Sequence, residues 1–224
     1  SRGEIHIIRD MAKVTVSKKT SAIGKAKAAL ASATATATNL ALRKLKKKKG
    51  VAEKLEVAVA QAIFDLEIAS KELKPELQPL HFVSAKEVII KRDRKAIVIF
   101  VPKRQIAAWH RIYVRLVREL EKKFSGKQIL ILAQRRWQKT PASIKVHRPI
   151  ARTRAVVEQS ILEDVVYPVD IVGKRTRVKL DGSFHIRVFL DPREKATYEN
   201  RLSTYSAVYS KITGKNVKFE FPTV

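Results

Sequence analysis

The stretch Ala96-Ile97-Val98-Ile99-Phe100-Val101 is an unbroken run of apolar residues that ends at Pro102. A strand with one solvated face would alternate apolar and polar residues, so a continuous run indicates a strand that is buried on both faces. A shorter run, Val88-Ile89-Ile90, precedes it across a charged turn, and Ile129-Leu130-Ile131-Leu132 follows it. The sequence therefore predicts a sheet built around residues 96–101, with helices packed on it.

Apolar residues at three- and four-residue spacings predict helices in the rest of the chain. These stripes run through residues 51–73, 109–124 and 156–165. Asp191-Pro192-Arg193-Glu194 supplies an N-cap, a proline at the first helical position and an acid at the third, so a further helix begins there. We expect it to end at Gly214 and to be followed by an alternating strand over residues 217–221.

Residues 175–190 alternate between apolar and polar side chains around a central Asp-Gly pair, which predicts a β-hairpin. A two-residue turn would mix the two faces. A three-residue loop over 181–183, with Gly182 in the left-handed region, would instead pair Leu180 with Phe184 and keep the apolar side chains on one face. We therefore predict the three-residue loop.

The predicted fold is α+β: a mixed, mainly antiparallel sheet with packed helices, formed by residues 51–224 as a single domain. Residues 1–50 are predicted to form a basic, low-complexity N-terminal arm, since they are rich in Ala, Thr, Ser and Lys, and no acidic residue lies between Asp10 and Glu53. Ordering of this arm by a polyanion is one interpretation, and a cleaved organelle transit peptide is the alternative. Met11 is expected to be the usual first residue.

The charge of the chain restricts its partners. Its 224 residues include 47 Lys and Arg against 21 Asp and Glu, a net charge of +26, of which the first fifty residues carry +11 and the remainder +15. Such a chain attracts polyanions, so nucleic acid or an anionic membrane is the expected partner. No window approaches the ~18 apolar residues of a membrane span, and we expect no membrane partner. Without cysteine, disulfides and thiolate metal sites are excluded.

We find no sequence signature of an enzyme. A phosphate-binding P-loop needs a glycine five residues before its Gly-Lys pair, and none of the three Gly-Lys pairs has one. The five histidines, His6, His81, His110, His147 and His185, are scattered without the spacing of metal ligands. We therefore expect no catalysis, no metal, no cofactor and no small-molecule substrate.

The candidate site is basic. Residues 134–154 are predicted to form a long loop with seven basic residues, one His and no acid, and guanidinium groups bind phosphate oxygens bidentately. Trp137 can stack on a base, and packing against the domain is the alternative. Arg177 and Arg187 are expected to face each other across the hairpin, where like charges are unfavourable unless an anion or solvent separates them. The candidate binding residues are Arg135, Arg136, Trp137, Lys139, Lys145, His147, Arg148, Arg152 and Arg154 in the loop, Arg111 and Arg115 on a helix, Arg177 and Arg187 in the hairpin, and Lys46, Lys47 and Lys48 in the arm.

Several ungapped segments of this sequence resemble the eukaryote-specific small-subunit ribosomal protein seven family, which is unrelated to the bacterial protein of that number. They occur in the same order across roughly residues 51–222 and comprise Arg94–Pro102, Val114–Lys127, Ala133–Arg136, Ile161–Asp164, Ile171–Arg175, Val178–Ser183 and Tyr209–Pro222. The resemblance implies a structural constituent of the small ribosomal subunit that binds ribosomal RNA through its basic loop and helix. It also implies contacts with neighbouring ribosomal proteins, a role in subunit assembly and ribosomal RNA maturation in the nucleolus, and residence in cytoplasmic ribosomes.

Composition alone also allows a protein of another class, a free-standing basic protein that binds DNA or chromatin. Sedimentation with small ribosomal subunits or with chromatin separates the two hypotheses.

Overall fold

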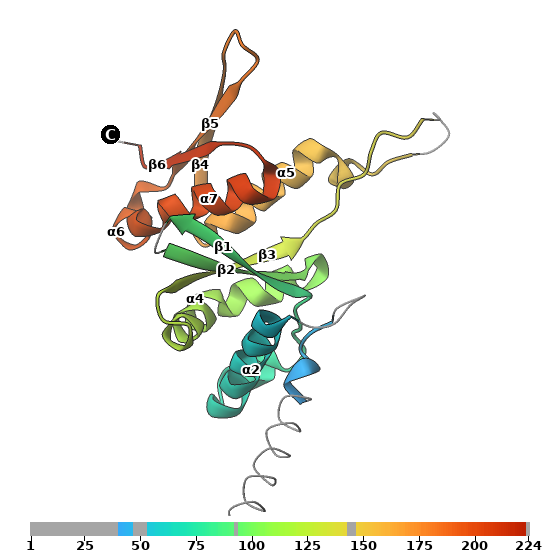
Figure 1. The fold of residues 1–224 in the computed structure, drawn as a ribbon, viewed down its shortest axis with the longest axis vertical. Coiled ribbons are helices and arrows are strands. Elements are labelled where there is room, and N and C mark those ends of the chain that lie inside the picture. The colour runs from blue at the N-terminus through green and yellow to red at the C-terminus, as the bar shows by residue number, and fades with distance from the viewer. Residues whose placement is uncertain (1–39, 47–52, 92–93, 143–146, 223–224) are drawn as a thin grey trace, which may run out of the picture.

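The computed structural model describes residues 40–46, 53–91, 94–142 and 147–222 (Figure 1). Short 3₁₀ turns connect some of the elements. The helices are α2 (Lys54–Ala69), α3 (Lys74–Leu77), α4 (Ile106–Lys123), α5 (Arg154–Val166), α6 (Lys195–Tyr198) and α7 (Leu202–Thr213). The strands are β1 (Ser84–Lys91), β2 (Arg94–Pro102), β3 (Lys127–Gln134), β4 (Ile171–Val178), β5 (Phe184–Leu190) and β6 (Val217–Glu220).

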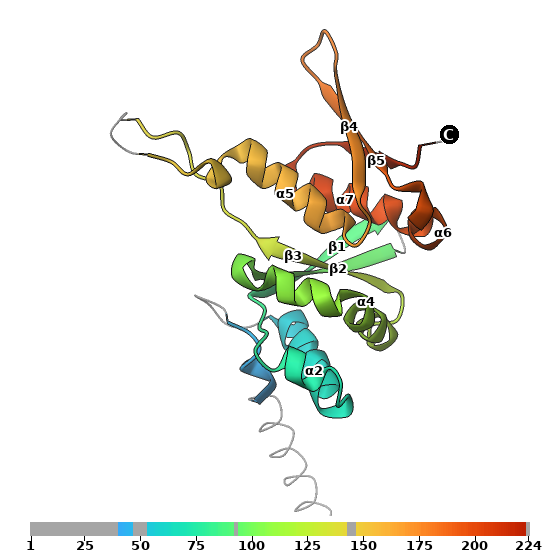
Figure 2. The same cartoon turned by 180° about the vertical axis from the view of Figure 1, so that it is seen from behind.

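The predicted central strand is confirmed as β2, the middle strand of a sheet in the order β1-β2-β3. One face of this sheet buries Ile97 and Ile129 against α2 and α4. The other buries Val98 and Leu130 in a second core that includes α5 and α7 (Figures 1 and 2). Because helices cover both faces, apolar residues are required at successive positions of β2, as its sequence indicates.

The α+β class and the mixed strand pairing are confirmed, but the described residues form two sheets rather than one. The second sheet has the order β4-β5-β6. In each sheet one pair of strands is antiparallel and one is parallel, so the pairing is not mainly antiparallel. Helix α4 connects β2 to β3, and α7 leads from β5 to β6. Such crossover helices carry the chain back to the end of the sheet at which the first strand began, so the two connected strands run parallel.

The hairpin is confirmed, but its register is shifted by two residues. Val178, rather than Leu180, pairs with Phe184, and residues 179–183 form the connection. The Lys179 N–H donates to the Ser183 carbonyl at 2.8 Å, and Gly182 has the predicted left-handed backbone, with φ of +74°. A shift of two residues preserves the alternation of faces, so the apolar side chains of β4 and β5 remain on one side.

The helix start at Asp191 is confirmed, because its side chain accepts a hydrogen bond from the Arg193 N–H at 3.0 Å. The end at Gly214 is also confirmed, with φ of +74°. Between them, however, the chain forms two short 3₁₀ segments and the separate helices α6 and α7.

Part of the predicted arm packs on the folded domain. Ala41 is buried, and the ammonium group of Lys44 pairs with Glu67 at 2.7 Å and donates to the Leu77 carbonyl at 2.8 Å. Residues 1–39 and 47–50 of the arm lie outside the described residues. The described chain therefore contacts the domain from well before residue 51.

Candidate nucleic-acid interface

The predicted basic loop leaves the first sheet at the end of β3, returns at the start of α5, and projects away from the domain (Figures 1 and 2). The outgoing and returning segments of the loop lie side by side, because the Gln138 N–H donates to the Arg152 carbonyl at 2.9 Å. The Arg148 guanidinium donates to the Gln138 carbonyl at 2.8 Å and joins the two segments of the loop a second time. These contacts hold the described part of the loop as a narrow projection with few apolar contacts.

Most of the predicted loop residues that the structure describes are accessible. Arg136, Lys139, His147 and Arg152 are exposed, and Arg148 is half-buried. None of them forms an ion pair with another described residue. Trp137 is 47% exposed, which leaves much of its ring available for stacking. Lys145 lies outside the described residues.

Arg135 differs from the rest of the loop, because its guanidinium is held inside the protein. Its Nε and Nη2 donate to the carboxylate of Asp164 at 3.1 and 2.9 Å, and the side chains are only 14% and 6% exposed. The same carboxylate accepts the Ala133 N–H at 3.2 Å. Arg135 therefore joins the end of β3 to α5, and its charge is used within the fold.

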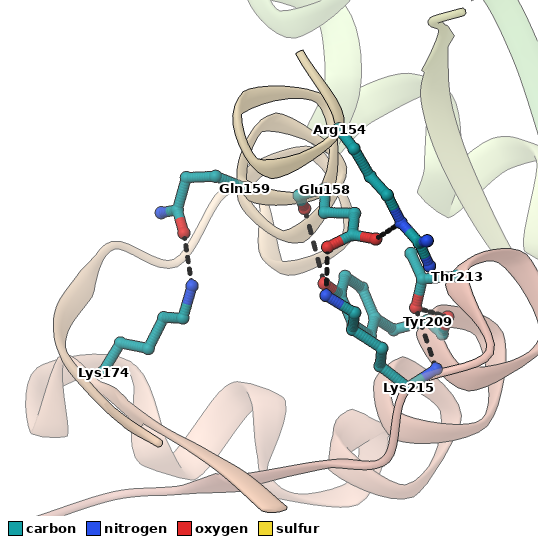
Figure 3. Close-up of polar contacts among 7 residues, drawn as sticks. All are labelled: Arg154, Glu158, Gln159, Lys174, Tyr209, Thr213 and Lys215. Carbon is teal, nitrogen blue, oxygen red and sulfur yellow. Dashed lines mark hydrogen bonds and ion pairs between the residues drawn. The ribbon is translucent and has the colours of Figure 1, made fainter. Parts of the chain in front are cut away.

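Arg154 also belongs to an internal network, which Figure 3 shows. The Glu158 carboxylate accepts a hydrogen bond from Arg154 at 2.8 Å and forms an ion pair with Lys215. Burial acts to raise the pKa of Glu158, but the hydrogen bonds from Lys215 and Arg154 outweigh it and lower that pKa. Nearby, Lys174 donates to Gln159 at 3.0 Å. The network ties β4 and the start of β6 to α5, although the Arg154 side chain is 63% exposed and keeps part of its surface in solvent.

The other predicted residues lie on separate surfaces. Arg111 and Arg115 are exposed on α4, opposite its buried stripe, and Arg115 pairs with the exposed Glu72 at 3.1 Å. Arg177 and Arg187 lie on the outer face of the second sheet, which turns away from α5 and α7. The hairpin and the basic loop project in different directions (Figures 1 and 2).

Arg177 and Arg187 are not directly opposite, as the predicted register had them. Arg175 pairs with Arg187 instead, and Arg177 pairs with His185. Arg175 was missed by the sequence prediction, although the alternation that selected Arg177 also places Arg175 on the same face. Lys218 was missed because its place beside Arg187 depends on the pairing of β5 with β6.

In the predicted arm, Lys46 is exposed and its N–H donates to the Phe82 carbonyl at 2.9 Å, while Lys47 and Lys48 lie outside the described residues. Within the described ranges, no group of three His, Asp or Glu side chains is placed to hold a metal ion. None of the helices described here is long and apolar enough to cross a bilayer.

Comparison with known proteins connects this geometry to a family. Residues 43–221 match the family model described as Ribosomal protein S7e. Small ribosomal subunit protein eS7z of Arabidopsis thaliana is 51% identical over 181 residues, which span 80% of this chain and 95% of that protein. The eS7 proteins of Schizosaccharomyces pombe and Manduca sexta are 46% and 44% identical and cover 75% and 76% of this chain, and 87% and 92% of their own. Because both kinds of match extend over most of the chain, it belongs to the ribosomal protein S7e family.

Proposed function

We propose that this chain is a structural constituent of the small ribosomal subunit that binds ribosomal RNA, principally through the basic loop. The observation that carries the proposal is the placement of Arg136, Lys139, Arg148 and Arg152 on a narrow projection without an ion-pairing partner among the described residues. Unpaired cations on a projection repel one another until a polyanion neutralises them. The relatives are named as small-subunit proteins, and this supports the identity of the polyanion.

The same proposal assigns supporting roles to the other surfaces. Arg154, whose side chain is partly exposed, is the first residue of α5, where the loop ends, so we assign it to the same contact with phosphates. Arg111 is exposed on α4, which follows Pro102, the residue that pairs with Gln134 at the end of β3, and we assign it a supporting role. Arg135 is not included, since its charge is already paired. Contacts with neighbouring ribosomal proteins, a role in subunit assembly and RNA maturation in the nucleolus, and residence in cytoplasmic ribosomes complete the proposal. The family is one of structural ribosomal proteins, and no catalytic role is proposed.

The salt dependence of binding to purified small-subunit ribosomal RNA tests the role of the loop. Each phosphate contact contributes roughly 0.7–0.9 to the slope of log affinity against log salt. The variant Arg136→Gln/Arg148→Gln/Arg152→Gln should therefore lower that slope by about 2–3. A matched control, Arg193→Gln/Lys195→Gln/Lys211→Gln, removes the same charge from exposed positions elsewhere and should lower it by less than about 1.

Equal slopes for the two variants would refute the loop assignment. Sedimentation of the tagged full chain from a eukaryotic lysate tests the subunit role. Co-migration with small subunits at high salt supports it, and association with chromatin instead would favour the free-standing DNA-binding protein.

A further inference from the structure

The outer face of the second sheet carries three cations in one row. Arg175 on β4 pairs with Arg187 on β5, and Arg187 pairs with Lys218 on β6. Residues paired across strands point to the same face, and neighbouring strands are about 5 Å apart. All three side chains are exposed. Three like charges are thus held side by side by the backbone hydrogen bonds of the sheet.

A hollow lies beside this row, on the same face. It has a volume of about 310 Å³, and its lining includes the cationic side chains Arg177, Lys179, Arg187 and Lys218 together with His185 and Asn216. None of the described residues that line it is acidic. The hollow is therefore a concave surface on which positive charge converges from all three strands.

Internal contacts neutralise only one edge of this surface. Lys218 pairs with Glu220 at 2.6 Å, and the Arg175 guanidinium lies over the ring of Phe189, 5.5 Å from its centroid. A ring face attracts a cation but does not cancel its charge. Neither Arg177 nor Arg187 forms an ion pair with a described residue. Such a face costs stability in the free protein, which an anionic ligand would restore.

We propose that the outer face of β4-β5-β6 is a second phosphate-binding surface, which holds a stretch of RNA backbone separate from the stretch bound by the basic loop. The proposal rests on the RNA-binding function proposed above. A nucleic-acid backbone fits better than an acidic protein because protein–nucleic-acid interfaces are much more positively charged than protein–protein interfaces, and the described lining of this hollow has four Lys and Arg side chains and no acid. Guanidinium groups at strand spacing can instead bind successive phosphate oxygens bidentately.

The fold connects the two surfaces through α5. The loop ends at the start of α5, while Glu158 and Gln159 of α5 contact Lys215 and Lys174 (Figure 3). Lys174 precedes Arg175 on β4, and Lys215 lies shortly before Lys218 on β6. The two surfaces are thus held on one framework, so one folded RNA can engage both with the advantage in affinity that bivalent binding gives.

The test compares three variants of the full chain with purified small-subunit ribosomal RNA across roughly 50–200 mM KCl. Arg177→Gln/Arg187→Gln/Lys218→Gln removes the sheet surface, Arg136→Gln/Arg148→Gln/Arg152→Gln removes the loop surface, and Arg193→Gln/Lys195→Gln/Lys211→Gln is the charge-matched control. The sheet variant should lower the salt slope by about 2–3 and the control by less than about 1. The single variant Arg187→Gln, at an exposed position that forms no ion pair with a described residue, should lower it by about 1 and serves if the triple variant does not fold.

The outcomes separate this proposal from the previous one. A lower slope for the sheet variant with an unchanged slope for the loop variant would support the sheet surface and refute the loop. A sheet variant that matches the control would overturn the sheet surface, whatever the loop variant does. Polyglutamate is the second probe, and loss of polyglutamate binding by the sheet variant without loss of RNA binding would overturn the proposal in favour of an acidic protein partner.

Discussion

Removing Asp164 should destabilise the protein, because its carboxylate forms a buried ion pair with Arg135. Asp164 is 5% exposed and accepts hydrogen bonds from Arg135 and from the Ala133 N–H. Breaking a buried ion pair by removing one partner costs about 3–5 kcal/mol, since the other charge remains buried without compensation. The Arg135 side chain is 14% exposed, so water compensates it in part, and we expect a loss at the low end, about 3 kcal/mol, for Asp164→Ala. For a domain of this size, the melting temperature should fall by about 6–12 °C.

Urea unfolding followed by far-ultraviolet circular dichroism measures the free energy of unfolding. Asp164→Asn is the graded control, because its amide oxygen can still accept one hydrogen bond, and it should cost less than Asp164→Ala. In a double-mutant cycle, Arg135→Met/Asp164→Leu should be more stable than either single variant, since no buried charge is left alone. A loss below about 1 kcal/mol for Asp164→Ala would mean that the pair is solvated. Arg135 would then return to the candidate RNA-binding set.

Three further predictions concern other charged groups. Glu158→Gln should lower the free energy of unfolding at pH 7 but not at pH values below the folded pKa of Glu158. Hydrogen bonds from Lys215 and Arg154 lower that pKa against the effect of burial. The stability that the Glu158 carboxylate contributes is therefore present above its unfolded pKa of about 4.3 and is lost as the pH falls through the folded pKa. Urea midpoints at both pH values measure this, and a pH-independent difference would contradict it. Arg187→Thr should raise stability by about 0.2–1 kcal/mol in urea unfolding while weakening RNA binding, because it relieves like-charge repulsion across the sheet; a loss of stability would show that the repulsion is already screened. Lys44→Ala should cost about 2 kcal/mol in the same assay, because it leaves a carboxylate without its cation, and no change would mean that residues 40–46 add nothing to the domain.

Local sequence patterns correctly predicted the elements whose formation depends mainly on neighbouring residues. The apolar run over residues 96–101 predicted a strand buried on both faces, and Asp191 with Pro192 predicted a helix start. Both signals depend on neighbouring residues only, and both are confirmed. The number of sheets was not predictable in this way, because it depends on whether β4 pairs with the first three strands. The sequence of β4 itself does not indicate which strand it pairs with.

The hairpin register shows where a local pattern fails. The prediction assumed that Leu180 is apolar because it packs, and therefore paired it with Phe184. In the structure the tip of the hairpin extends beyond the core, and Leu180 is fully exposed. Burial cannot select a register where nothing covers the strands, so the hydrogen bonds of the connection decide it, notably the one from Lys179 to Ser183.

The candidate site shows the same limit for charge. Arg135 and Arg136 are adjacent and chemically identical, but only Arg135 meets a carboxylate, which lies 29 residues further along the chain. Charge density therefore locates the basic loop without showing which of its cations are free to bind. That distinction comes from tertiary pairing, which neutralises Arg135 within the fold and leaves Arg136 without an ion pair among the described residues, while RNA binding by either residue stays a prediction.

The net charge of +26 is consequently a poor guide to the cations that a partner can reach. Some cations are neutralised within the fold, and others are brought together only by strand pairing. Lys44 and Lys215 are neutralised within the fold, each by a largely buried carboxylate. Arg187 and Lys218 lie outside the basic runs of the sequence, but strand pairing places them in one row with Arg175. A cation that lacks a carboxylate although the fold could have supplied one is a stronger indication of an external anion than a cluster of lysines in the sequence. Lys218 pairs with Glu220 and does not meet this criterion, but Arg177 and Arg187 form no ion pair with a described residue, and they make the second sheet as strong a candidate for phosphate binding as the loop.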